Sequence, residues 1–279
     1  MDELSLSQTE ALHFDSIRRW IGIHTGLHYP ERKYCTLYHR LRKLCHELDI
    51  PDLKTLDQHL QQRDLPNLSI QLACAVSTNH TYYFREEESM QFFQEQIIPT
   101  LPPNEPWRIW SAASSSGDEA YSLAIILAEA LGVAEAQQKT AILGTDISFN
   151  VLEQAEYGIC NEQRLDKVPK PLRDKYFRTM GLGQWGINPE IKQLCTFRQL
   201  NLMNYPWPFK QNFHVIFCRN VLYYFDRPKQ IELVERLYDA TTPGGWLITS
   251  VTESLWNMNS RWQSVRTGIY HKGFGRNGK

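Results

Sequence analysis

The sequence lacks the features that would place it in a special class of proteins. Of its 279 residues, 42% are hydrophobic and 22% are charged, and the formal net charge is −1. No apolar run approaches the roughly 20 residues that span a bilayer, so we expect no membrane insertion. A net charge near zero gives no global field toward nucleic acid or a membrane surface, so any electrostatic recognition must be local.

The sequence also shows no clustered cysteines and no pattern of a signal peptide. The six cysteines are scattered, with no Cys-x-x-Cys pair and no Cys/His cluster at zinc spacing. We therefore expect reduced thiols rather than a disulfide, and no metal site. The first ten residues, MDELSLSQTE, are acidic and polar, the reverse of a signal peptide. Together with ordinary globular composition this predicts a soluble, cytoplasmic protein, which we expect to be a monomer.

The chain changes in texture along its length. Its first part carries apolar residues at helical spacing, and its second part alternates apolar strands with amphipathic helices. Strands separated by helices predict an α/β fold with a parallel, doubly wound sheet. We predict an N-terminal helical domain over 1–75, a linker segment over 76–106 and an α/β domain over 107–279. Within the last, about 160–200 fits the alternation poorly and is interpreted as a small antiparallel β insertion.

A polar loop follows the first predicted strand, in the stretch SAASSSGDEAYSLAIIL (111–127). Loops that hold phosphate at a helix N-terminus are rich in glycine, but this loop has only Gly117, followed by Asp118 and Glu119. Two carboxylates repel a pyrophosphate and suit a ligand with cationic groups and hydroxyls. S-adenosylmethionine has a sulfonium, an ammonium and a ribose diol. Asp146 follows the second strand, where an acid would accept hydrogen bonds from that diol.

The two loop acids have a simpler interpretation too. They could only stabilise the N-terminus of the helix through its dipole. The placement of Asp146 after the next strand favours the cofactor over that alternative.

Five stretches then occur in order: STNHTYYFRE (77–86), WSAASSSGDEAYSLA, GTDISFNVLEQAEYGIC, LNLMN and VIFCRNVLYYFD (215–226). Together they resemble the chemotaxis receptor methyltransferase family of the CheR type, over nearly the whole chain. The resemblance implies a Rossmann-like methyltransferase sheet joined to an N-terminal all-helical domain and carrying a small antiparallel β insertion. It also implies S-adenosyl-L-methionine as cofactor and S-adenosyl-L-homocysteine as product.

The resemblance implies cofactor contacts from the linker segment and from loops of the sheet. These residues are Asn79, Thr81, Arg85, Glu119, Asp146, Asn201, Leu202, Asn220 and Val221. Their chemistry agrees, since Arg85 can form a bidentate pair with the methionine carboxylate and Glu119 can meet the cationic end. Asn201 has an amide able to read the adenine edge. The alternative for Arg85 is a surface ion pair with Glu86 or Glu87.

The implied reaction transfers a methyl group to glutamate side chains of chemotaxis receptors, giving methyl esters. A glutamate side chain, with a pKa of about 4.3, is already ionised at neutral pH and needs no general base. Catalysis then rests on positioning and desolvation, and we assign no catalytic residue. Tyr223 and Tyr224, just beyond CRNV, either shape the methyl pocket or pack in the core.

Methylation of acidic receptor helices predicts a basic surface on the enzyme. The stretch ERKYCTLYHRLRKLCHEL is rich in arginine and lysine, and we predict substrate recognition by Arg40, Arg42 and Lys43. The alternative is an ordinary solvated helix face. The turn MGLGQWGI in the insertion could be a second receptor site, because some family members dock a receptor's C-terminal peptide there.

Two other functions stay open. One is a methyltransferase that uses the same cofactor on another acceptor, such as a small molecule, and the other is a non-catalytic partner-binding module. The basic helix favours a protein acceptor, and the retained cofactor residues argue against the module. Nucleic acid is not expected, because no basic stripe with interleaved aromatics runs along the chain. Near the end, TSVTESL keeps Thr252 and Glu253 of a stretch typical of the family, without its glycine.

Overall fold

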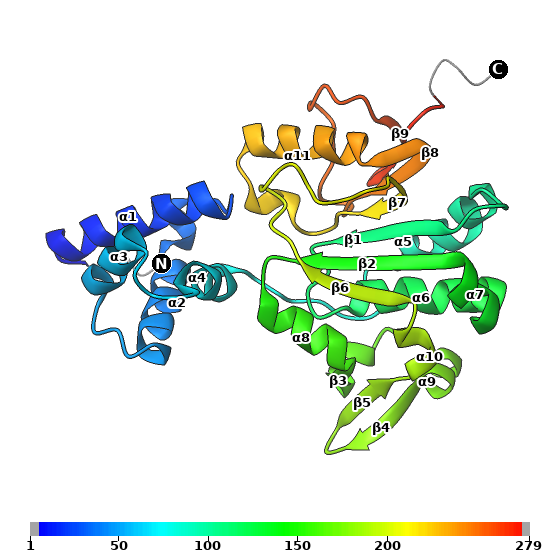
Figure 1. Ribbon diagram of the computed structural model, residues 1–279, viewed down its shortest axis with the longest axis horizontal. Helices are drawn as coiled ribbons and strands as arrows, with labels where there is room; N and C mark the ends of the chain where they lie inside the picture. The colour runs from blue at the N-terminus through cyan, green and yellow to red at the C-terminus, as the bar shows by residue number, and fades with distance from the viewer. Residues whose placement is uncertain (1–5, 275–279) are drawn as a thin grey trace.

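The computed structural model describes residues 6–274. Half of the N-terminal stretch that argued against a signal peptide, residues 1–5, lies outside the described residues, as does 275–279. A group of helices lies beside a layered α/β domain (Figure 1). Within 6–274, no helix is both long and apolar enough to cross a bilayer.

The predicted N-terminal helices are present, and each turns an apolar stripe inward. In the first helix the buried residues are Phe14, Ile17, Trp20 and Ile21, at helical spacing. The third begins at Asp52, whose carboxylate accepts a hydrogen bond from the Thr55 N–H at 2.8 Å. The four helices are α1 (Gln8–His24), α2 (Tyr34–Glu47), α3 (Leu53–Gln62) and α4 (Leu68–Val76).

A seven-stranded sheet forms the centre of the second part, in the order β6-β2-β1-β7-β8-β10-β9. The first five strands of this order are parallel to their neighbours, and the last two form an antiparallel edge. The doubly wound fold class is thereby confirmed, with a terminal hairpin that we did not predict. The strands are β1 (Trp107–Ala112), β2 (Thr140–Asp146), β6 (Cys195–Gln199), β7 (Phe213–Phe217), β8 (Thr241–Ile248), β9 (Gln263–Arg266) and β10 (Ile269–His271).

Helices cover both faces of the sheet, which divides the buried apolar residues into two cores. Side chains alternate along each strand, so Trp110 joins one core and its neighbour Ile109 the other. The Trp110 core is continuous with the interior of the N-terminal helices. The covering helices are α5 (Glu87–Phe92) with its continuations η2 (Phe93–Ile97) and η3 (Ile98–Thr100), α6 (Asp118–Leu131), α7 (Val133–Lys139), α8 (Phe149–Tyr157) and α11 (Arg227–Asp239).

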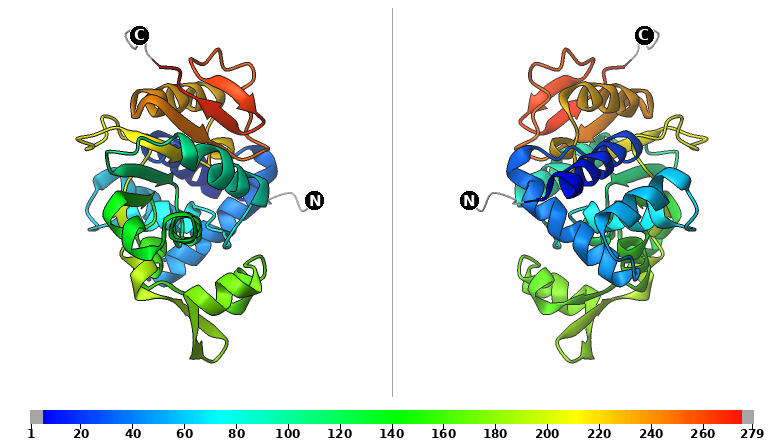
Figure 2. Two further views of the ribbon diagram at one scale, coloured as in Figure 1. Left: turned by 90° about the vertical axis from the view of Figure 1, so that its right-hand side faces the viewer. Right: turned by 90° about the vertical axis from the view of Figure 1, so that its left-hand side faces the viewer.

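The small antiparallel insertion is a three-stranded sheet that projects from the main body (Figures 1 and 2). It contains β3 (Ile159–Asn161), η4 (Glu162–Leu165), α9 (Lys170–Tyr176), β4 (Phe177–Gly181) and β5 (Gln184–Ile187), and α10 (Pro189–Lys192) follows it. Our interpretation of about 160–200 as one insertion was wrong at its C-terminal end. There the short strand β6 pairs in parallel with β2 in the main sheet. The Phe197 ring packs over Gly144, which leaves no room there for a side chain.

Candidate functional site

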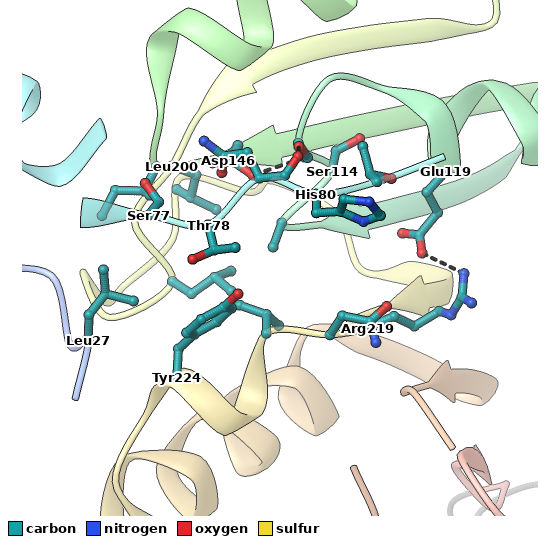
Figure 3. A pocket seen from close by; sticks show the side chains of 18 of the residues that line it. Leu27, Ser77, Thr78, His80, Ser114, Glu119, Asp146, Leu200, Arg219 and Tyr224 are labelled. Carbon is teal, nitrogen blue, oxygen red and sulfur yellow. Dashed lines mark hydrogen bonds and ion pairs between the residues drawn. The ribbon is translucent and has the colours of Figure 1, made fainter. Parts of the chain in front are cut away.

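A cavity that is partly open to solvent lies at the carboxyl ends of the parallel strands (Figure 3). Ligands of doubly wound sheets bind at this edge. The cavity is lined by residues at the ends of β1, β2, β6 and β7 and in the loops that follow them. The segment 77–81 crosses it, and Thr25 and Leu27, which follow α1, complete it.

All nine residues predicted to contact the cofactor line this cavity. They are Asn79, Thr81, Arg85, Glu119, Asp146, Asn201, Leu202, Asn220 and Val221. The fold thus brings together side chains more than a hundred residues apart in the chain. One wall comes from the N-terminal half, where Gly26 packs so closely that a Cβ atom would lie 2.3 Å from the Met203 side chain.

Glu119 belongs to a buried charge cluster that the sequence did not reveal. Arg219, only 1% exposed in its side chain, lies with Nη1 2.9 Å from Glu119 and Nη2 3.3 Å from Glu86. Ser111 donates a further hydrogen bond to Glu119 at 2.7 Å. Figure 3 shows the ion pair of Glu119 with Arg219 at the cavity wall. One signal in the sequence could have indicated this role: Arg219 directly follows the apolar strand in VIFCRNV.

The pKa of Glu86 reflects this cluster. Burial by itself raises the pKa of this carboxyl, but the Arg219 charge and hydrogen bonds from Ser250 and Asn220 outweigh it and lower the pKa. Glu86 therefore stays ionised and ties the segment 77–86 to the loops after β7 and β8.

Asp118 does not face the cavity, which corrects our interpretation of the loop. Its side chain is fully buried and forms an ion pair with Arg164 of η4, whose Nε lies 2.7 Å from the carboxylate. Burial raises the pKa of Asp118, and Arg164 opposes that shift. Successive residues on a helix point in different directions, so only Glu119 of the two acids lines the cavity. Asp118 instead fastens the insertion to the main sheet.

Asp146 both lines the cavity and organises its floor. Its two carboxylate oxygens accept the backbone N–H groups of Ser115 at 2.9 Å and of Ser148 at 3.0 Å. Burial raises the pKa of Asp146, and these backbone hydrogen bonds oppose the shift. Ser115 has φ of 50°, so the carboxylate holds the 111–119 loop in a backbone conformation that most residues avoid.

The two asparagine amides make bonds within the protein. Asn201 donates to the His24 carbonyl at 2.8 Å and accepts from the Met203 N–H at 2.9 Å. These bonds join the end of α1 to the loop after β6, and contact of the amide with the adenine edge stays a prediction. Asn220 donates from Nδ2 to Glu86 at 3.2 Å, which continues the charge cluster.

Arg85 is half-buried at the cavity and makes no surface ion pair of the kind considered as its alternative. Its Nη1 donates to the His80 carbonyl at 3.0 Å, and its guanidinium lies 5.8 Å from the Tyr82 ring centroid. Within the described part of the chain no carboxylate pairs with it, because Glu86 turns instead to Arg219. The guanidinium remains available to an anionic group in the cavity.

The two tyrosines after CRNV differ in position. Tyr224 lines the cavity, whereas Tyr223 stands outside it and is 48% exposed. Tyr224 also packs against the core that contains Trp110, and the ring centroids of the two tyrosines are 4.4 Å apart. The Lys33 ammonium lies 5.5 Å from the Tyr224 ring centroid. Tyr224 therefore stands at the mouth of the cavity, between the two halves of the chain.

Glu253 holds the turn that carries these residues. Its carboxylate accepts the N–H groups of Asn220 at 2.7 Å, Ser250 at 3.3 Å and Tyr223 at 3.4 Å. Burial raises the pKa of Glu253, and the backbone donors oppose the shift. Because Asn220 has φ of 57°, the turn depends on this acceptor for its shape.

The three residues predicted to recognise the substrate have different surroundings. Arg40 bonds internally, to the Ser77 carbonyl at 3.1 Å and to Thr78 Oγ1 at 2.8 Å. It thereby fixes a segment that lines the cavity, and a role on the surface is at odds with these contacts. Arg42 and Lys43 are exposed, and Lys43 pairs loosely with Glu47 at 3.6 Å. Of the three predicted residues, Arg42 and Lys43 are the two whose side chains are exposed on α2.

Comparison with known proteins places this site in a family. Residues 79–270 match the family described as CheR methyltransferase, SAM binding domain. A chemotaxis protein methyltransferase of Borreliella burgdorferi is 32% identical over 92% of this chain and 94% of its own. Chemotaxis protein methyltransferase 2 of Pseudomonas aeruginosa is 33% identical over 92% of this chain and 91% of its own. That of Vibrio anguillarum is 30% identical over 98% and 99%.

Proposed function

The chain belongs to the CheR family of chemotaxis protein methyltransferases that use S-adenosylmethionine (SAM), and we propose that its acceptor is a glutamate carboxylate of a chemotaxis receptor. The observation that supports the cofactor site most directly is the meeting of all nine predicted contacts at one cavity. We further propose that the protein acts as a cytoplasmic monomer, alongside receptors whose helices carry the methylation sites.

The charges in the cavity fit the cofactor. Two carboxylates, Glu86 and Glu119, surround the single guanidinium of Arg219, so the cluster keeps one net negative charge. We propose that this charge attracts the cationic end of SAM, since opposite charges interact strongly in a partly buried site. We assign the ribose diol to Asp146 and the methionine carboxylate to Arg85.

The cofactor supplies an activated methyl group on a sulfonium. In the proposed reaction an oxygen of the acceptor carboxylate bonds to the methyl carbon, and the carbon–sulfur bond breaks with its electron pair left on sulfur. The acceptor is ionised at neutral pH, so the chain needs to supply no base. Its own residues position the acceptor and exclude water, and the apolar wall of Leu27, Val221 and Phe225 serves the second task.

Receptor recognition by Arg42 and Lys43 remains a proposal, supported by their exposure on α2. The internal bonds of Arg40 on the same helix run to the segment that lines the cavity. Acidic receptor helices would meet this basic surface close to the site of transfer.

The experiment is transfer of labelled methyl from SAM to membranes that contain a chemotaxis receptor. We expect label on the receptor and its release as methanol on mild base treatment, which marks a methyl ester. A receptor whose candidate glutamates are changed to alanine is the control and should stay unlabelled. Label that withstands base, or label found only on small molecules, would contradict the proposed acceptor.

A further inference from the structure

An exposed apolar surface lies beside the cavity mouth. It consists of Tyr223, Val251 and Trp256, which are 48%, 44% and 80% exposed, and we call it the Trp256 surface. Exposed apolar side chains that occur as a group, rather than singly, often mark a binding surface. The cavity and its contacts described above give Trp256 no role.

The backbone beneath Trp256 is firmly held. Its neighbours Leu255 and Met258 are buried, at 6% and 5% exposure. The Leu255 N–H donates to the Tyr270 hydroxyl at 2.9 Å, and Arg227 donates to the Trp256 carbonyl at 3.3 Å. The indole thus projects from a fixed position rather than from a loose loop. A preorganised aromatic of this kind loses little entropy when it binds.

The Trp256 surface adjoins the cavity through short contacts. Glu253, three residues before Trp256, accepts the N–H groups of both Tyr223 and Asn220. The Tyr223 ring in turn packs against Tyr224, which lines the cavity. Hydrogen bonds thus connect the loop that carries Glu253 and Trp256 to the turn that carries Tyr223 and to the start of α11.

We propose that the receptor helix carrying the modified glutamate packs against the Trp256 surface; this inference rests on the proposed function. A glutamate side chain is short, so its helix must lie directly on the mouth. Residues of the receptor helix that lie one or two turns from this glutamate, at about 5.4 Å per turn, then contact the surface of the enzyme beside Tyr224. Tryptophan and tyrosine are the residues that most often dominate such contacts.

The charges at the Trp256 surface suit an acidic helix. Arg227 is exposed at the start of α11, with its guanidinium on the Trp256 carbonyl and on the Gln230 side chain. A second cation, Lys33, lies 5.5 Å from the ring centroid of Tyr224. A helix rich in glutamate, apolar where it meets Trp256, complements both features.

The test compares Trp256→Ala with the wild-type chain in receptor methylation, using membrane vesicles that contain a chemotaxis receptor. We expect KM for the receptor to rise about 30-fold, the smallest effect of losing an interface hot spot. The dissociation constant of S-adenosylhomocysteine (SAH), measured by calorimetry, should stay unchanged, because Trp256 does not line the cavity. Trp256→Phe should restore most of the wild-type KM.

The matched control is Phe274→Ala. Phe274 is 77% exposed but packs over Gly244, at the end of β8 that lies away from the cavity. Its truncation should leave KM unaltered. A wild-type KM for Trp256→Ala, with active transfer by both chains, would overturn the Trp256 surface as a docking site. Failure of the wild-type chain to methylate any receptor would instead overturn the proposed function, and this inference with it.

Discussion

Nη1 of Arg219 lies 2.9 Å from the Glu119 carboxylate at the wall of the cavity. This contact joins the end of β7 to the first turn of α6, a hundred residues apart in the chain. The same guanidinium also reaches Glu86 and the Arg85 carbonyl, so three segments of the cavity converge on one buried cation. The geometry of the cavity therefore depends on Arg219 as much as on the other residues that line it.

Replacing Arg219 by methionine should both unfold the protein more easily and weaken cofactor binding. Breaking a buried ion pair from one side leaves uncompensated carboxylates and typically costs about 3–5 kcal/mol. Denaturant unfolding and SAH calorimetry measure the two effects. Adding Glu119→Gln to Arg219→Met should recover part of the lost free energy of unfolding, because one unpaired charge disappears. An unchanged free energy of unfolding in Arg219→Met would show that the ion pair of Arg219 with Glu119 does not stabilise the fold.

Asp146→Asn should weaken SAH binding by roughly 1–3 kcal/mol, as for loss of a charged hydrogen-bond partner. The effect should depend on pH. Because burial raises the pKa of Asp146, the free protein takes up this proton at a higher pH than an ordinary aspartate. The ionised form is then lost earlier as pH falls, so SAH affinity in the wild type should begin to decline at a higher pH than an ordinary aspartate would give. The variant should show a flatter profile; identical profiles would exclude Asp146 as the cause.

Glu253→Gln should distort the turn at Asn220 to Tyr223. The amide nitrogen of glutamine would face backbone N–H donors, so at least one of them loses its acceptor, at a cost of about 1–3 kcal/mol. Because Asn220 and Val221 line the cavity, we expect both weaker SAH binding and slower methylation. Glu232→Gln is the control, since Glu232 lies exposed on α11 and pairs only with Arg236. Equal effects from the two variants would rule out a specific role for Glu253.

Much of the site followed from the sequence, because local patterns report which residues end a strand. Glu119 follows β1 and Asp146 ends β2, and parallel strands bring their carboxyl ends together. What the sequence could not reveal are pairings set by tertiary contact. Asp118 meets Arg164 from the insertion, and Arg40 turns inward to the segment after α4. In both cases the two contacting residues are far apart in the chain, and no periodic pattern in the sequence indicates the contact.

The strand β6 shows the same limit for the fold. Its sequence CTFRQ is short and half polar, so alternation alone does not assign it to a particular sheet. Its place at the edge next to β2 comes from the Phe197 ring, which packs on Gly144 and lies 5.5 Å from the Tyr121 ring centroid. Such a contact exists only once the sheet has formed.

Reversing the charge of Arg42 and Lys43 to glutamate should slow receptor methylation without altering SAH affinity. Both residues are exposed on α2, and neither lines the cavity. Exposed charges act mainly on the encounter rate, so added salt should weaken the wild-type reaction through screening over about 8–10 Å. Lys210→Glu, in the loop before β7, is the control. Normal methylation by the double variant at low salt would make this helix face merely solvated surface.

The most direct test of the cofactor site is hydrogen–deuterium exchange with and without SAH. In the proposed site the ligand lies where segments from both halves of the chain meet. We therefore expect SAH to slow exchange in 77–86, in the 111–119 loop, and in the turns at 200–202 and 219–224, with no change on addition of NAD. The hairpin of β4 and β5 should exchange at its original rate. Protection limited to the sheet loops, with 77–86 unaffected, would contradict a cavity shared by the two halves.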